Sequence, residues 1–364
     1  MFSCVSCGSQ LHFCNSVNFR DFKLVTSDCR EFEGGGDLCN CLNCGLLQRP
    51  RSEIWRKNCQ EIYAQYEAHR QGGGEEQQIF EAAVGQSRSS KIVSRLLESA
   101  VIKNGCSWLD YGCGEGHFLE SLSSLRPDIS LTGTDYRPTP PSRLRSFGKI
   151  DYFSIEREIV KSFDWISLIH VVEHFFEPLV DLRRLHRLLR PEGHLFIQVP
   201  NLRANPFDLV IIDHGTFFIE ETICAALMRA GFSVEFVTDG WVNKELSIIA
   251  SVGVESDWHR YDVSAKRTEE ILRSHHQFLS ELRTDIQNKR QTGDVTIFGS
   301  SIGATWAAIE CGKEYVLQFV DEDISRQNSL HLNIPINEPD LNISNVIVPL
   351  EERTRRRIEK KYNF

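Results

Sequence analysis

Apolar and polar residues alternate along the middle of the chain in a pattern typical of strands separated by amphipathic helices. The pattern predicts helices at 116–125, 177–190 and 219–230, and strands at 107–111, 129–135, 163–170, 194–199, 232–238 and 246–252. Because parallel strands need helical crossovers, this order predicts an α/β fold with a doubly wound sheet covered on both faces. The last two strands are nearly contiguous, so we expect them to form an antiparallel pair at one edge.

The segments on either side of this sheet differ in pattern. Residues 53–69 have helical periodicity, the polar span 257–290 reads as a helix, and a strand–helix–strand pattern restarts at Asp294. We therefore expect five regions: an N-terminal module (1–50), a helical linker or lid (51–104), the sheet domain (105–256), a helical spacer (257–292) and a smaller C-terminal Rossmann-like domain (293–364).

Composition narrows the class of protein. The 364 residues carry a formal charge of −9, and no apolar run approaches the ~20 residues that span a bilayer. The first residues resemble no export signal, so we expect a cytoplasmic protein with no membrane contact. Seven of the 12 cysteines lie in the first 44 residues, which in a reducing compartment favours metal ligation over disulfides.

Two C-x-x-C-G knuckles supply the predicted metal ligands, Cys4 with Cys7 and Cys41 with Cys44. Two thiolates from each knuckle complete a tetrahedral shell with no open position, so we expect a structural Zn²⁺ that organises the module. Cys39, in Cys39-Asn40-Cys41, offers a competing ligand. Cys14 and Cys29 are expected to be bystanders, although one of them could replace a knuckle sulfur.

A glycine-rich turn ends the first strand of the sheet and opens the next helix. Gly112, Gly114 and Gly116 allow the backbone to approach a ligand, and the helix start offers free N–H donors. Asp135 ends the next strand, where a carboxylate can accept both hydroxyls of a ribose. These features predict a site for an adenosine-containing ligand.

The G-x-G-x-G turn after Asp110, the acid at Asp135, the V-x-E-H segment at 171–174 and the turn at 188–195 together resemble class I S-adenosylmethionine-dependent methyltransferases over residues 105–252. The resemblance implies a Rossmann-like methyltransferase sheet with S-adenosylmethionine as cofactor. It implies cofactor contacts from the following residues: Asp110, Gly112, Gly114, Gly116, Asp135, Tyr136 and His170.

Methyl transfer needs an aligned nucleophile and often a base. Two histidines are candidates, because imidazole abstracts protons near neutral pH. His214 follows the fifth strand with Asp213 beside it, and we expect it to be the base, oriented by Asp213. His174, in the turn after the fourth strand, is the alternative, with a structural role in that turn equally open.

The cysteine-rich module ending in C-x-x-C-G-L-x-Q, the central domain and the C-terminal half-Rossmann unit together resemble the nucleotide-sugar C-methyltransferases of deoxysugar pathways. That family carries Tyr-His-Glu-His after the fifth strand, whereas this chain has Ile211-Ile212-Asp213-His214. We therefore expect a small-molecule acceptor, a nucleotide-linked sugar or related saccharide, methylated at carbon or at oxygen.

Two other classes of protein fit parts of the pattern. Zinc-containing RNA methyltransferases combine similar modules, but the net negative charge disfavours phosphate binding, so we expect no nucleic-acid partner. A non-catalytic protein that binds S-adenosylmethionine only as a ligand is the third reading, and the intact glycine turn and Asp135 argue against it.

Overall fold

A seven-stranded sheet forms the centre of the computed structural model, which describes residues 2–66, 75–76, 78–81, 84–147, 150–155, 159, 162–253 and 264–364. Its strand order is β10-β9-β8-β11-β12-β15-β14. The strands are β8 (Ser107–Tyr111), β9 (Ser130–Asp135), β10 (Asp151–Ser154), β11 (Phe163–Ile169), β12 (Leu189–Pro200), β14 (Phe232–Thr238) and β15 (Glu245–Val252). β8 to β12 are parallel, and β15 runs antiparallel to both of its neighbours. The predicted fold class and the antiparallel edge pair are confirmed.

Side chains from the two faces of the sheet enter separate cores. Along β8, Trp108 packs in the core that includes α2 (Arg88–Ser99) and α3 (His117–Leu125), whereas Leu109 and Tyr111 belong to the core with α5 (Pro178–Leu188) and α6 (Glu220–Arg229). Trp108 stacks on Trp165 of the neighbouring strand, with ring centroids 4.9 Å apart. This alternation is what the pleat of a strand buried on both faces requires.

The cysteine-rich module forms a second, four-stranded antiparallel sheet with the central domain. Its order is β1 (Leu11–Phe13), β4 (Cys39–Cys41), β5 (Leu47–Gln48) and β13 (Thr216–Phe217), so the last strand comes from the segment that follows β12. A short hairpin, β2 (Leu24–Val25) with β3 (Glu31–Phe32), completes the module. Residues 1–50 are therefore built into the central domain rather than tethered to it.

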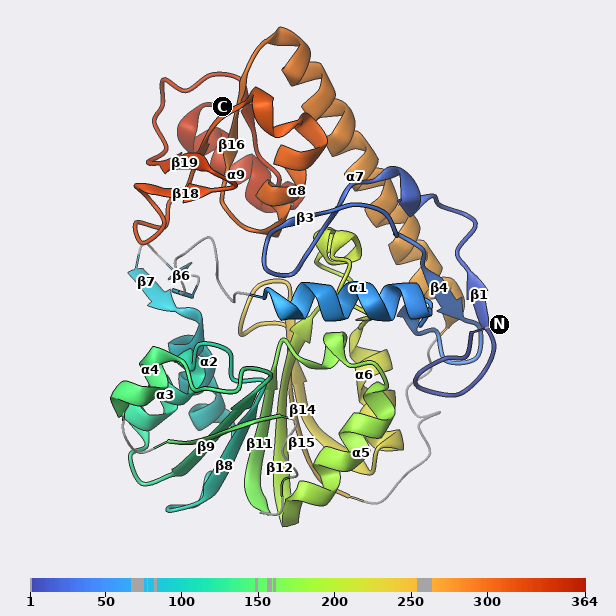
Figure 1. Cartoon of the computed structure of the whole chain (residues 1–364), viewed down its shortest axis with the longest axis vertical. Helices are drawn as coiled ribbons and strands as arrows, with labels where there is room; N and C mark the ends of the chain where they lie inside the picture. Colours follow the sequence, from blue (N-terminus) through green and yellow to red (C-terminus); the bar gives the residue numbers. More distant parts are fainter. Residues whose placement is uncertain are drawn as a thin grey trace.

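The segment predicted as a linker begins with α1 (Glu53–Ala64), which lies between the central sheet and the C-terminal unit (Figure 1). Beyond it, β6 (Gln78–Glu81) and β7 (Val84–Ser87) form a hairpin that leads into α2, and the short helix α4 (Ser142–Phe147) follows β9. Residues 67–74 of the predicted linker or lid lie outside the described residues.

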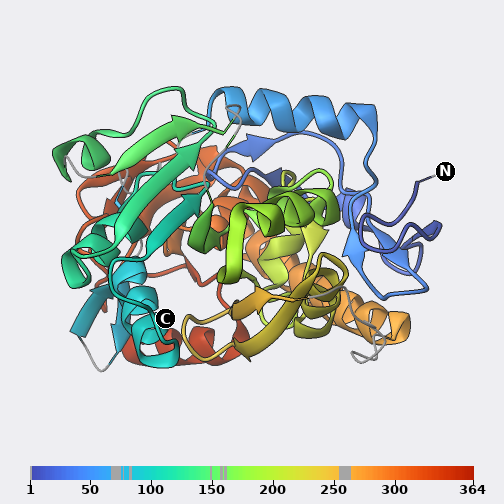
Figure 2. The same cartoon turned by 90° about the horizontal axis from the view of Figure 1, so that it is seen from below.

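The predicted spacer is a packed helix, α7 (Ala265–Thr292). One apolar stripe, which includes Leu272, Leu279 and Ile286, is buried in a core shared with the N-terminal module and the C-terminal unit. Figures 1 and 2 show the N-terminal module beside one end of α7, where Thr268 Oγ1 donates a hydrogen bond to the Gly45 carbonyl (2.7 Å). A polar composition concealed this stripe, because only every third or fourth residue is apolar.

The C-terminal unit is a five-stranded sheet in the order β18-β19-β17-β16-β20. Its elements are β16 (Val295–Phe298), α8 (Ile302–Cys311), β17 (Val316–Val320), β18 (Ser329–His331), β19 (Ile334–Asn337), β20 (Val346–Ile347) and α9 (Glu352–Tyr362). β16, β17, β19 and β20 are parallel, as a half-Rossmann unit requires. None of the described helices combines the length and hydropathy needed to cross a bilayer.

Arg49 joins the N-terminal module to the segment after β12. Its guanidinium is fully buried and donates to the backbone carbonyls of His214 (3.1 Å), Leu209 (2.9 Å) and Ile211 (3.0 Å). Burial lowers the pKa of this side chain to about 10, so it remains charged at neutral pH. A single buried cation thus fixes three carbonyls of one loop.

Replacing Arg49 by Met should destabilise the protein by about 3 kcal/mol or more, because each buried carbonyl that loses its donor costs about 1–3 kcal/mol. The free energy of unfolding from chemical denaturation measures this. Arg20→Met is the control: its side chain is 67% exposed beside Asp37, so its loss should have a much smaller effect on the free energy of unfolding. Equal effects of the two substitutions would contradict this role of Arg49.

Candidate active site

The glycine turn adopts the conformation that its sequence requires. Gly112, Gly114 and Gly116 have φ values of 79°, 53° and 86°, in the left-handed region where a side chain is strained. A Cβ on Gly112 would lie 2.6 Å from Val171, and one on Gly116 would lie 2.3 Å from Leu144. A side chain at residue 112 or 116 would therefore collide with these neighbours and would also strain the backbone, so both positions need glycine.

Asp135 lies against this turn. Its Oδ2 accepts a hydrogen bond from the Gly114 backbone N–H (3.0 Å), and its side chain is 19% exposed. Arg137 lies across the same turn and donates to Glu115 Oε1 (2.6 Å) and to the Gly114 carbonyl (2.5 Å). The turn and the acid that follows β9 thus form one partly open cradle at the carboxyl ends of β8 and β9.

Asp110 is buried beneath the cradle rather than open to it. Its Oδ1 accepts a hydrogen bond from Ser167 Oγ (2.6 Å), and Ser167 in turn accepts one from Trp108 Nε1 (2.9 Å). Burial raises the pKa of this carboxyl to about 7. In this arrangement Asp110 fixes the start of the turn to β11.

The other two residues expected at the cofactor lie on opposite sides of the cradle. Tyr136 is 62% exposed and stacks on Tyr63 of α1, with ring centroids 5.7 Å apart. His170 has φ 54° at the end of β11, with Nδ1 3.3 Å from Glu173 and Nε2 3.1 Å from Glu245. Burial and Arg88 disfavour the charged imidazole, but the two carboxylates outweigh them and raise the pKa of His170 to about 9.

The two candidate histidines lie together next to this cradle. The rings of His174 and His214 meet edge to face, with centroids 4.6 Å apart. His174 lies in the 3-10 turn Val172–His174 directly after β11, and Tyr63 OH lies within hydrogen-bond distance of its Nδ1 (2.9 Å). Because Tyr63 also stacks on Tyr136, α1 connects the histidines to the glycine cradle.

The carboxylate that pairs with His214 is Asp208, not the expected Asp213. His214 Nδ1 lies 2.5 Å from Asp208 Oδ1, and both residues are buried. Asp213 instead accepts hydrogen bonds from the N–H (2.8 Å) and Oγ (2.5 Å) of Ser27 and lies 3.5 Å from His174 Nδ1. Asp213 and His214 are adjacent in the sequence but have different partners, because the backbone places successive side chains on different sides of the segment.

The pKa values of the two histidines move in opposite directions. Burial, helped by the positive charge of His214, lowers the pKa of His174. Burial also disfavours charge on His214, but the Asp208 carboxylate outweighs it and raises the pKa of that histidine. The pair therefore separates into one imidazole that holds its proton less firmly than a free histidine and one that holds it more firmly.

Sequence reasoning missed Asp208, Tyr63 and Ser27. A charged residue inside the apolar segment Phe207–Ile212 was a signal for Asp208, because a buried carboxylate needs a partner. Tyr63 and Ser27 gave no such signal, since they reach the histidines from the region before the sheet domain.

The four knuckle cysteines also lie together. They are distant in the sequence from the strands of the central sheet, but β5, which follows Cys44, pairs with β13 near the histidines. Their sulfurs lie within 4.8 Å of one another, with Cys4 Sγ 3.5 Å from Cys44 Sγ and Cys7 Sγ 3.4 Å from Cys41 Sγ. Sulfurs around a tetrahedral Zn²⁺ at ~2.3 Å would be roughly 3.8 Å apart, so the cluster fits a metal with slight expansion. Cys14, Cys29 and Cys39 are not in this cluster.

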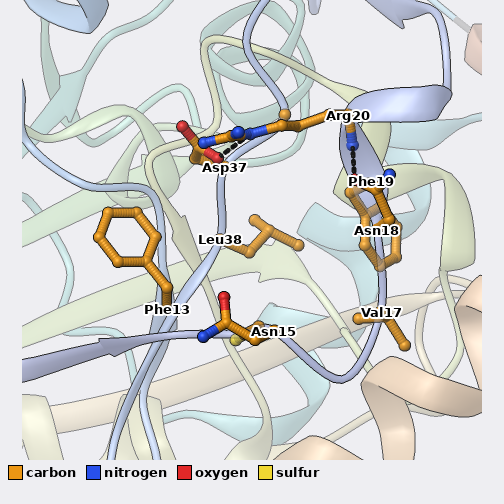
Figure 3. Close-up of a pocket in the computed structure, with 10 residues that line it drawn as sticks. Phe13, Asn15, Val17, Asn18, Phe19, Arg20, Asp37 and Leu38 are labelled. Atoms are coloured by element: carbon orange, nitrogen blue, oxygen red, sulfur yellow. Dashed lines mark hydrogen bonds and ion pairs between the residues drawn. The ribbon is translucent and has the colours of Figure 1, made fainter.

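A hollow of about 340 Å³ opens elsewhere, on the N-terminal module (Figure 3). It is lined by Phe13, Leu38 and their neighbours, with the Arg20–Asp37 ion pair at its rim. The residues that line it include none of the candidate site residues. The hollow is therefore a surface depression of the N-terminal module and not part of the candidate active site.

Comparison with known proteins identifies relatives of the central domain. A family model described as a methyltransferase domain matches residues 82–236. The ubiquinone biosynthesis O-methyltransferase of Xanthomonas axonopodis pv. citri (strain 306) is 30% identical over 178 residues, which cover 42% of this chain and 73% of that protein. The enzyme of the same name from Pseudomonas paraeruginosa is 28% identical over 118 residues, covering 30% of this chain and 50% of that protein. The chain thus spans nearly three quarters of one curated relative and half of the other.

Two solved structures are also similar. The complex between the Haloferax volcanii Trm112 methyltransferase activator and the putative methyltransferase matches at 14% identity and TM-score 0.40, covering 46% of this chain and 91% of that chain. An S-adenosylmethionine dependent methyltransferase from Mesorhizobium loti matches at 18% identity and TM-score 0.37, covering 43% and 96%. The family model and the Xanthomonas relative agree with the strand order and the glycine cradle, and on these grounds the chain belongs to the S-adenosylmethionine-dependent methyltransferases.

Proposed function

We propose that the protein transfers a methyl group from S-adenosylmethionine to a hydroxyl oxygen of a small molecule. The observation that carries this proposal is the position of Glu173, His174 and His214 next to the glycine cradle. Val171, which packs on Gly112, is only two residues before Glu173, so the cradle and the cluster share one edge of the sheet. The names of the curated relatives support oxygen as the methylated atom.

The cofactor would be held by the cradle. The backbone of Gly112–Gly116 would face its amino-acid part, Asp135 would accept the ribose hydroxyls, and Tyr136 and His170 would flank the adenosine from either side. Bound there, S-adenosylmethionine supplies an electrophilic methyl group on a positively charged sulfur. Asp110 supports this site from below through Ser167 rather than by contact.

The acceptor hydroxyl would lie against the histidine pair. His174 is the better exposed member, with 16% of its side chain accessible against 4% for His214. His214, the base expected from sequence, is therefore placed behind His174, supported by Asp208, while Asp213 supports His174. We infer that ionisation of the hydroxyl takes place at this pair.

A nucleotide-linked saccharide is a second candidate acceptor, favoured by one feature of the C-terminal unit. After β16, Gly299 has φ 87°, and Ser300 Oγ donates to Asp321 Oδ2 (2.6 Å) at the end of β17. A glycine turn followed by an acid at the carboxyl ends of parallel strands suits a ribose. Assaying small phenols and nucleotide sugars in parallel, with labelled S-adenosylmethionine, would decide between the two acceptor classes.

The cysteine cluster is proposed to hold one structural Zn²⁺ through Cys4, Cys7, Cys41 and Cys44. Gln48 Nε2 points at Cys4 Sγ (3.3 Å), and Gln48 belongs to β5, which pairs with β13 two residues after His214. Metal loss should therefore disturb the histidine pair more than the cofactor cradle.

Cys41→Ser should remove this zinc and lower the thermal midpoint of unfolding, because an ion that binds only the folded arrangement of the four sulfurs stabilises the folded state. Elemental analysis and thermal unfolding measure the two effects. Cys14→Ser is the matched control and should keep the metal; loss of metal from both variants, or from neither, would show that the ligand set is wrong.

Asp135→Ala should weaken binding of S-adenosylmethionine by about ten- to a hundred-fold, since a charged hydrogen-bond partner contributes about 1.5–3 kcal/mol. Gly114→Arg should abolish binding, because residue 114 has φ 53° and lies against Asp135. Calorimetry measures both affinities, and Asp128→Ala, an exposed carboxylate at another turn of the sheet, should bind normally. An Asp135→Ala protein with unchanged affinity would refute the cradle.

His174→Gln and His214→Gln should each lower single-turnover methyl transfer by about 10²–10⁴-fold while leaving cofactor affinity unchanged. His194→Gln, on β12 and paired with Glu235 (3.6 Å), is the control and should transfer at the normal rate. If both cluster variants transfer at full rate, the acceptor binds elsewhere and the proposed function of this pair is wrong.

A further inference from the structure

Three side chains of the cluster are close enough to share one ion. One ligand atom each from Glu173, His174 and His214 can be chosen so that all lie within 4.8 Å of one another. Glu173 and His214 are 0% and 3% exposed, so this is an interior site rather than a surface group of charges.

The carboxylate of Glu173 lacks hydrogen-bond donors in the described part of the chain. Neither of its two buried oxygens accepts a hydrogen bond, although His170 Nδ1 lies 3.3 Å from Oε1 as an ion-pair partner. A buried carboxylate without donors is costly, and nearly all such groups in proteins have partners. A bound cation would satisfy both oxygens.

The outer nitrogens of the two imidazoles are already held. His214 Nδ1 lies 2.5 Å from Asp208, and His174 Nδ1 lies 2.9 Å from Tyr63 OH and 3.2 Å from the Asp213 carbonyl. Nε2 is therefore the nitrogen of each ring that remains to coordinate an ion. Histidines that bind metals are usually oriented in this way, with the other ring nitrogen bonded to a carboxylate or a carbonyl.

We propose that Glu173, His174 and His214 form a second metal site, for a divalent transition-metal ion of the Zn²⁺ type. Imidazole nitrogens favour such ions over Mg²⁺ and Ca²⁺, which prefer oxygen ligands. Two histidines and one glutamate would occupy three positions, and the fourth would be left for a ligand on the side of His174, the more accessible of the two histidines. The four-cysteine cluster has no such open position.

The role of this metal site rests on the proposed function, to which it adds a means of activating the acceptor hydroxyl. The hydroxyl oxygen of the acceptor would take the fourth position, where a divalent cation lowers the pKa of a bound hydroxyl. Its proton leaves to water, the oxygen lone pair forms the new bond to the methyl carbon, and the carbon–sulfur bond breaks with its electron pair on sulfur. Asp208 and Tyr63 are positioning residues in this arrangement.

The first test counts zinc in the full-length protein after removal of metal with a chelator and titration with Zn²⁺, without acceptor or cofactor. The wild type should bind two ions per chain, and Glu173→Gln, an isosteric change, should bind one. Glu177→Gln, an exposed glutamate one turn further on, should still bind two. Asp208→Asn should weaken the second ion by about ten- to a hundred-fold.

Co²⁺ loading identifies which ion is lost. Glu173→Gln should keep the intense thiolate-to-cobalt charge-transfer band of a cysteine site, and Cys41→Ser should lose that band while retaining the weaker absorption of a nitrogen and oxygen site. A Glu173→Gln protein that keeps two ions, or a wild type that binds only one ion with thiolate character, overturns the second site. In that case, slow transfer by His174→Gln would leave the proposed function standing without a cation.

Discussion

The burial of Arg49, with the half-buried Arg51 close behind it in the sequence, at the join between the N-terminal module and the central domain is the constraint on which the rest of the site depends. A guanidinium out of water must find acceptors, and Arg49 finds three backbone carbonyls of the segment 209–214. Arg51 finds others, donating to the carbonyls of Gly215 (2.5 Å) and Phe176 (3.0 Å) and to Thr216 Oγ1 (2.8 Å). The turn after β11 and the segment after β12 are thereby fixed to the same short stretch of chain.

This stretch directly follows the second cysteine knuckle. Cys44 lies five residues before Arg49, and β5 between them pairs with β13. A structural ion in the knuckles would therefore act at a distance on the histidine pair, by fixing the strand that directly precedes the two arginines. This accounts for a closed cysteine cluster in a methyltransferase whose chemistry lies elsewhere.

Charge in the interior of the site is arranged around the histidines. Three buried carboxylates surround His174 and His214: Glu173, Asp208 and Asp213. Two of them have hydrogen-bond partners, since Asp208 contacts His214 and Asp213 contacts Ser27. Only Glu173 is left without a hydrogen-bond donor among the described residues. Asp208 and Asp213 are therefore occupied in supporting the side chains that they contact, whereas Glu173 is the carboxylate that could bind a ligand.

The sequence by itself determined the central fold and the conformation of the glycine cradle, because both depend on local patterns. Gly112, Gly114 and Gly116 need positive φ whatever surrounds them, the apolar strands need cover on both faces, and paired C-x-x-C knuckles bring their own sulfurs together. The tertiary structure decided the partners: Asp208 rather than Asp213 for His214, Tyr63 of α1 for His174, and a packed α7 where a spacer was expected. The contact between Tyr63 and His174 joins residues 111 positions apart, and that between Thr268 of α7 and Gly45 joins residues 223 positions apart. The direction of a side chain across such a contact depends on the packing of whole elements, which no local pattern encodes.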